Sequence, residues 1–195
     1  MTATMKPSAK FAIKPAIKPA MKAITNTASA PRTLATPTDL GTEQVRAISE
    51  CVNILIADTL ALYLKTKNFH WHLSGSHFKE YHELFDDQAD QLLESVDLLA
   101  ERVRKLGATT LRSISHVTGL QQIVDDHQEA IDPLEMVQRL LSDNKHMVRS
   151  QRAAIKVCDL HGDSPTSNIL QTLLDESERR VWFLFEITRD SPVSA

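Results

Sequence analysis

Apolar residues recur three and four positions apart along most of the chain after Gly41. This spacing marks one face of an amphipathic helix. No proline interrupts residues 38–132, and glycines punctuate the pattern at Gly75, Gly107 and Gly162. The pattern predicts four long helices, over about residues 42–73, 77–106, 133 to just before Gly162, and 165 to 187.

The third and fourth predicted helices begin with a capping residue and a proline. Asp132 precedes Pro133, and Ser164 precedes Pro165. The side chain of a capping residue accepts a hydrogen bond from a free helical N–H, and proline suits the first helical position because its missing N–H would have no partner there. We therefore expect Asp132 and Ser164 to be the N-caps of these helices.

The connection between the second and third helices, residues 107–131, is long for neighbours in a bundle. A connection of about 25 residues indicates that the chain crosses the length of the bundle before the third helix starts. Within it, residues 117–129 (VTGLQQIVDDHQE) are periodic enough to predict a short helix, and we interpret His116 and His127 as surface residues. The predicted fold is all-α: a ferritin-like four-helix bundle with a short helix in the long crossover between helices 2 and 3.

Composition is consistent with one soluble domain. Hydrophobic residues make up 42% of 195, and no run approaches the roughly 18 apolar residues of a membrane span. The only cysteines, Cys51 and Cys158, fall in predicted helices, so we expect two core thiols in a reducing compartment rather than a disulfide framework. We divide the chain into a disordered N-terminal arm (1–40), the bundle (41–190) and a short C-terminal tail (191–195).

The N-terminal arm is cationic. It holds five of the eight prolines, and its bases are Lys6, Lys10, Lys14, Lys18, Lys22 and Arg32. Prolines within the lysine repeat exclude a regular helix and favour an extended or disordered segment. Through Thr38 the arm contains no acid and carries +6, which leaves 16 bases against 25 acids, or −9, for the rest of the chain.

Three readings of the arm are open. An organellar transit peptide would favour arginine and an amphipathic helix, and this arm has one arginine and helix-breaking prolines. A solubilising tail needs no regular charge. Because the charge is regular and of one sign, we prefer a tail that binds double-stranded DNA through its phosphates, independently of sequence.

Residues 68–104 combine histidines and carboxylates with helical spacing. His82 and Asp86 are four apart, as are Asp97 and Glu101, and His70 precedes them near the end of the first helix. Residues four apart share one helix face. A solvated face would explain any one of these residues, but their common stripe favours a metal site.

The two pairs cannot share one metal within a single chain. Asp86 and Asp97 are eleven residues apart, about three turns, so they share a side of the helix but stand roughly 16 Å apart. Either the helix carries two half-sites, or each pair is completed elsewhere. An antiparallel contact between two copies of the helix across a two-fold axis would build two equivalent sites. His72 lies about 200° from His70 around the helix, so we leave it out of the site.

Several segments together resemble the Dps proteins, the DNA-protecting miniferritins of starved bacteria. They are LKTKNFHWHLSG, HELFD, DLLAERVRKLG, TTLRSI and SERRVWFLFE, within about residues 42–189. The resemblance implies a hollow homododecamer with a site for two iron ions at each two-fold interface. Carried over, the ligands are His70, His82 and Asp86 of one chain with Asp97 and Glu101 of the other. A ferritin site within one subunit would use Glu-x-x-His, which does not occur in this sequence.

The resemblance also implies a ferroxidase that oxidises Fe(II) with hydrogen peroxide, or more slowly with oxygen, and stores Fe(III) mineral. Lys67 resembles the family's lysine near the metal and would orient a carboxylate. Trp71 would absorb a stray oxidising equivalent or, equally, pack the helix end. The expected location is the bacterial cytoplasm, at the nucleoid. The alternatives are a structural DNA-compacting shell with a vestigial or zinc-occupied metal site, and a helical interaction protein whose histidines are incidental.

Overall fold

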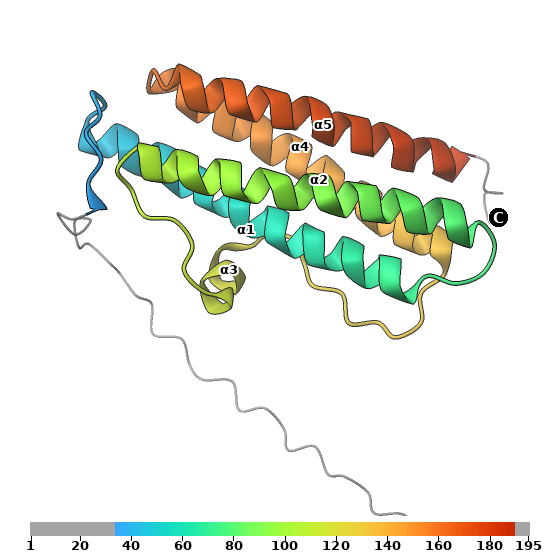
Figure 1. Ribbon diagram of the computed structural model, residues 1–195. Helices are drawn as coiled ribbons and strands as arrows, with labels where there is room; N and C mark the ends of the chain where they lie inside the picture. The colour runs from blue at the N-terminus through green and yellow to red at the C-terminus, as the bar shows by residue number, and fades with distance from the viewer. Residues whose placement is uncertain (1–33, 190–195) are drawn as a thin grey trace, which may run out of the picture.

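The computed structural model describes residues 34–189, and within that range it consists of helices joined by loops, without strands (Figure 1). The helices are α1 (Thr42–His72), α2 (Phe78–Lys105), α3 (Ile114–Leu120), α4 (Pro133–Leu160) and α5 (Ser164–Arg189). Four of them are long, and their limits agree with the apolar pattern to within a few residues. The predicted all-α architecture is confirmed.

The four long helices form two hairpins that pack side by side (Figure 1). A short loop joins α1 to α2, and another joins α4 to α5, so each hairpin is antiparallel; α1 packs against α4 to join them. The core is apolar and includes Ile48, Val52, Leu62, Phe69, Phe85, Leu92, Leu99, Leu140, Met147, Leu170 and Leu184. The crossover, which contains α3, carries the chain back along the bundle, and α4 starts at its end.

Helix α1 has the length and hydropathy of a membrane-spanning helix, with a mean hydropathy of 1.5 over its most apolar stretch. Half of that stretch is buried, however, against the other helices of the bundle. The apolar residues of α1 therefore pack into the core of the bundle.

The N-cap prediction was right for α4 and wrong for α5. Asp132 accepts a hydrogen bond from the N–H of Leu134 at 2.9 Å. At α5 the cap is Asp163 instead of Ser164, because the Asp163 carboxylate accepts from the N–H of Thr166 at 3.2 Å. Arg102 of α2 holds this buried carboxylate in place at 2.7 Å, a tertiary contact with no local signal in the sequence.

The short helix of the crossover lies earlier than predicted. It begins at Ile114 because Ser113 caps it, accepting from the N–H of His116 at 3.2 Å, and it covers only the first part of residues 117–129. It ends at Leu120 because the fully buried Asp58 of α1 takes the next N–H groups, including that of Ile123 at 3.0 Å. Asp58 thereby ties the crossover to the bundle.

Residues 34–40, which we placed in the disordered arm, are described and contact the end of α2. The hydroxyl of Thr36 donates to the carbonyl of Arg104 at 2.9 Å, and Arg104 donates to the carbonyl of Leu34 at 2.7 Å. The remainder of the arm, with Lys6, Lys10, Lys14, Lys18, Lys22 and Arg32, lies outside the described residues.

Candidate metal centre

Two of the predicted ligands, His70 and His82, stack on each other where α1 ends and α2 begins. Their ring centroids are 3.7 Å apart. The Nδ1 of His70 lies 2.9 Å from the carbonyl oxygen of His82, and the Nδ1 of His82 lies 3.1 Å from the carbonyl oxygen of His70. A carbonyl only accepts, so each Nδ1 carries the hydrogen. In the neutral rings both Nε2 atoms then keep the lone pair that binds a metal.

A third predicted ligand, Asp86, lies beside this pair. It follows His82 by one turn of α2, and its Oδ1 is 3.7 Å from the Nε2 of His70. Folding therefore brings His70 near His82 and Asp86, which follow it by twelve and sixteen positions in the sequence. Nitrogen and carboxylate donors of this kind suit divalent transition metals, including Fe(II).

Lys67 contributes charge to this cluster. Its side chain is mostly buried, and its ammonium group hydrogen-bonds to Asp86 and lies 3.6 Å from Asp90. The bond to Asp86 raises the pKa of Lys67, and the same bond lowers the pKa of the Asp86 carboxyl below its usual value. Asp86 is thereby held ionised, which is the form that binds a metal.

The other two predicted ligands lie further along α2 and do not join the cluster. Asp97 and Glu101 are exposed, and Glu101 pairs with Lys105 at 3.2 Å. Within residues 34–189 of one chain, no three histidine, cysteine, aspartate or glutamate side chains are grouped closely enough to hold a metal ion. A single chain therefore places His70, His82 and Asp86 near one another without completing a metal site, and it leaves Asp97 and Glu101 apart from them.

Two exposed aromatic residues belong to the same region, where α1 ends and α2 begins. Phe78, near the start of α2, is 44% exposed and stacks on the ring of His82 with centroids 5.0 Å apart. Its position four residues before His82 was the available signal for this contact. Trp71 is 62% exposed, so it does not pack the end of α1 within its own chain.

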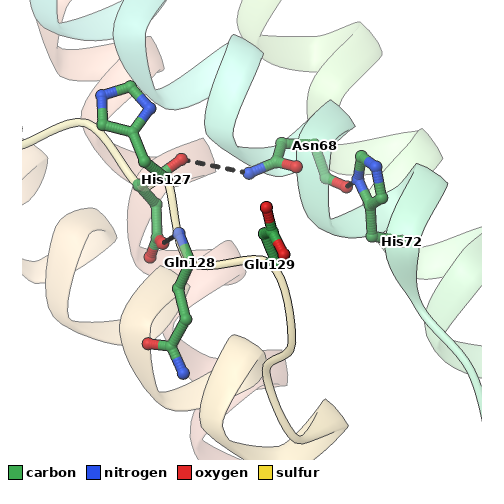
Figure 2. A pocket seen from close by; sticks show the side chains of 6 residues that line it. Asn68, His72, His127, Gln128 and Glu129 are labelled. Carbon is green, nitrogen blue, oxygen red and sulfur yellow. Dashed lines mark hydrogen bonds between the residues drawn. The ribbon is translucent and has the colours of Figure 1, made fainter. Parts of the chain in front are cut away.

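His72 lies on a different side of α1 from His70, as its helical angle predicted. It lines a pocket of about 290 Å³ together with Asn68, Asp126, His127, Gln128 and Glu129. Figure 2 shows these side chains between the end of α1 and the crossover. The Nδ1 of His72 lies 2.8 Å from the carbonyl oxygen of Asn68. His116 and His127 are exposed, as expected.

Cys51 and Cys158 are free thiols. Cys158 is buried in the core, and Cys51 is half-buried at its edge. The cysteines therefore form no disulfide, in agreement with the interpretation of the sequence.

Comparison with known proteins gives consistent matches. A ferritin-like domain model matches residues 50–191. The chain is 31% identical over 156 residues to a DNA protection during starvation protein of Agrobacterium fabrum, covering 78% of this chain and 94% of that protein. It is 27% identical to the structure of DpsC from Streptomyces coelicolor, with a TM-score of 0.77 over 82% of this chain and 94% of that one.

A second structure, a Dps protein from Vibrio cholerae O1, is 29% identical, with a TM-score of 0.74 over 80% of this chain and 98% of that one. That protein is described as a member of the ferritin-like diiron-carboxylate superfamily. These relatives connect the chain with iron storage and DNA protection in general. The helical bundle, the domain match and the similarity to proteins of this name agree, and the chain belongs to the Dps family of ferritin-like proteins.

Proposed function

We propose that this protein oxidises Fe(II) at sites shared between two chains and stores the Fe(III) product inside a homododecameric shell. In each site His70, His82 and Asp86 of one chain and Asp97 and Glu101 of its partner would bind two iron ions. The observation that carries the proposal is the grouping of His70, His82 and Asp86, with both Nε2 atoms free to bind metal. Asp97 and Glu101 are exposed at the distance along α2 that a second chain would complement.

The chemistry follows from the ligands. Fe(II) is the substrate, with hydrogen peroxide or oxygen as the oxidant. Two Fe(II) ions supply one electron each to one peroxide, and with two protons the products are two Fe(III) ions and two water molecules. Carboxylates favour Fe(III) because their negative charge compensates its higher positive charge. Lys67 would hold the carboxylate of Asp86 in position before iron arrives.

Exposed apolar side chains support assembly into a shell. A single chain leaves several large ones in solvent, namely Leu64, Trp71, Phe78, Leu93, Leu98, Ile114, Leu160, Trp182, Phe183 and Phe185. Such residues in number mark surfaces that other chains cover. Phe78 stacks on His82, and Trp71 follows His70 in the sequence, which fits a site completed at an interface. If Trp71 faces that site, it would accept a stray oxidising equivalent.

DNA protection would combine the removal of Fe(II) and peroxide with direct binding of the arm to DNA. In this proposal residues 1–40 are the arm, residues 41–190 build the shell and residues 191–195 form a tail. The chain after Thr38 carries −9, so attraction to phosphates rests on Lys6, Lys10, Lys14, Lys18, Lys22 and Arg32. The protein would act in the bacterial cytoplasm, at the nucleoid.

A structural DNA-compacting shell with a vestigial or zinc-occupied site is the second candidate. The contact that favours it is the Lys67–Asp86 ion pair, which satisfies this carboxylate without a metal. Zinc also accepts imidazole and carboxylate ligands. Such a shell would bind DNA but would not accelerate iron oxidation.

Complementation between two inactive variants tests the shared site. One variant carries His70→Ala, His82→Ala and Asp86→Ala, and the other carries Asp97→Ala and Glu101→Ala. We expect each alone to lose ferroxidase activity, measured as peroxide-dependent oxidation of Fe(II) by the assembled protein. Co-expressed, they should regain activity, because a mixed pair joins one fully mutated site to one fully wild-type site.

Two results would contradict the proposal. Mixed shells no more active than either parent would show that the site is not shared. A wild-type shell that binds zinc but oxidises iron no faster than buffer would favour the structural candidate. Shell integrity, checked by size-exclusion chromatography, separates loss of the site from loss of assembly.

A further inference from the structure

A buried arginine without a counter-ion lies between α2 and α5. Arg180 of α5 is 5% exposed, and no carboxylate among residues 34–189 forms an ion pair with it. Burial lowers the pKa of Arg180 to about 10, and the carboxylate of Glu176 only partly opposes this without touching it. An unpaired buried charge is unfavourable unless something compensates it.

The protein partners of Arg180 are all neutral. Its Nε donates to Oδ1 of Asn144 at 3.0 Å, its Nη2 to Oγ of Ser177 at 2.7 Å, and its Nη1 to Oε1 of Gln91 at 3.4 Å. A guanidinium has five N–H donors, so two remain, one on Nη1 and one on Nη2. These are the two nitrogens that together bind planar or tetrahedral oxyanions.

A second buried side chain next to Arg180 also has no partner. Gln88 of α2 is 2% exposed, and neither its Nε2 nor its Oε1 forms a hydrogen bond within the described part of the protein. Gln88 and Arg180 line the same pocket, together with Leu84, Asp87, Gln91, Arg179 and Phe183. Buried amides almost always have hydrogen-bond partners. The unpartnered amide of Gln88 and the unused donors of Arg180, in one pocket, therefore indicate a bound molecule.

We propose that this pocket binds a small inorganic oxyanion of the phosphate class. The pocket has a volume of about 40 Å³. A water needs roughly 10–15 Å³ by the same measure, so the space suits about three waters, close to one tetrahedral oxyanion. The two free N–H groups of Arg180 and the amide N–H₂ of Gln88 supply donors, and the anion supplies the missing charge.

The electrostatics of the lining favour an anion over water. Water would satisfy the Gln88 amide but would leave the charge of Arg180 uncompensated. Arg179 adds a second positive charge and lies over the ring of Phe183 at 5.8 Å. Asp87 is the one carboxylate among the lining residues, and it is exposed to solvent, which screens its charge. The site does not include the predicted iron ligands.

Calorimetric titration of inorganic phosphate into the iron-free, assembled, full-length protein tests the proposal, with ionic strength held constant by chloride. We expect saturable binding of one phosphate per chain. Gln88→Leu should weaken it by about tenfold or more, because a hydrogen bond to a charged group is lost. Arg180→Met should abolish it. Arg189→Met, an exposed arginine near the end of the same helix, is the matched control and should bind as the wild type does.

Unfolding of the Gln88→Leu variant shows whether a loss of phosphate binding comes from the lost amide or from a folding defect. Leucine removes an unpartnered buried amide, so this variant should unfold no more easily than the wild type in phosphate-free buffer. Added phosphate should raise the unfolding temperature of the wild type and not that of the variant. Several results would overturn the proposal: no binding beyond the chloride control, unchanged binding in Gln88→Leu, or an equal loss in Arg189→Met. Dissociation of the shell in Arg180→Met without phosphate binding by the wild type would mean that a partner chain pairs with the arginine.

Discussion

Gly107 ends α2 in a left-handed backbone conformation, with φ +82°, and another segment of the chain approaches it closely. A Cβ at this position would lie 2.8 Å from the carbonyl oxygen of Thr36. The approach is possible because Thr36 is hydrogen-bonded to Arg104, one turn before Gly107. This glycine therefore meets two requirements at once, a backbone angle and a close contact.

These requirements can be separated by comparing Gly107 with Gly162. Gly162 has a similar φ, +76°, with nothing within 4 Å of a Cβ. Alanine at either site should cost about 1–2 kcal/mol for the left-handed backbone. Gly107→Ala should cost roughly a further 1 kcal/mol, because residues 34–36 must shift. Denaturant unfolding at matched protein concentration measures both, and equal losses would mean that the Thr36 contact yields without cost.

At the scale of elements, Arg139 of α4 holds the crossover in place. It donates to the carboxylate of Asp126 at 2.6 Å and to the side chain of Gln128 at 2.7 Å. Burial acts to raise the pKa of Asp126, but the hydrogen bonds from Arg139 and from the N–H of Gln128 outweigh it, so the pKa lies below its ordinary value of 3.8. The ion pair thus stabilises the folded state when Asp126 is ionised.

Arg139→Gln should therefore destabilise the protein in a pH-dependent way. A depressed folded-state pKa contributes stability that is complete above the unfolded pKa and is lost as pH falls through the folded pKa. At pH near 7 we expect a loss of about 1–2 kcal/mol, and the gap from wild type should narrow below about pH 4. Thermal unfolding across pH measures it. The control is Arg46→Gln, which removes only exposed ion pairs with Glu43 and Glu50 and should have a clearly smaller effect. A constant gap at all pH values would exclude Asp126 as the cause.

At the scale of the whole molecule, positive charge is concentrated in the N-terminal arm and negative charge in the rest of the chain. Residues 1–38 carry +6 and residues 39–195 carry −9. A body of that sign repels DNA, so binding would rest on the arms. Many arms on one shell would act at high effective concentration and would bridge several duplexes.

Removal of residues 1–33 should abolish DNA binding. A form that begins at Leu34 keeps the contacts of Leu34 and Thr36 with α2 while losing all six arm cations. Gel-shift titration at two salt concentrations should show binding by the full-length shell alone, weakening steeply with salt at a logarithmic slope of about −0.9 per phosphate neutralised.

A full-length variant with the five arm lysines changed to glutamine tests whether DNA binding depends on the charge of the arm or only on its presence. It should behave as the truncated form does. Equal retention of DNA by the truncated, intact shell would show that the arm is not the binding element.

Much of this protein was predictable because its local signals agree with its tertiary contacts. The helical period, the glycines and Asp132 define the long helices, since each acts over one or two turns. The spacing of His82, Asp86, Asp97 and Glu101 also predicted that one chain would not bring all four together, because helical rise is independent of context.

Only the tertiary structure decided the features that depend on contacts between distant segments. Asp163 caps α5 because Arg102 holds it, and the crossover helix ends where Asp58 takes its N–H groups. The mutual hydrogen bonds of His70 and His82, and the pocket of Gln88 and Arg180, likewise exist only once separate helices pack. Sequence determines the elements and their faces through short-range sterics and periodicity, whereas the partner of a buried polar group depends on which distant residue packing brings to it.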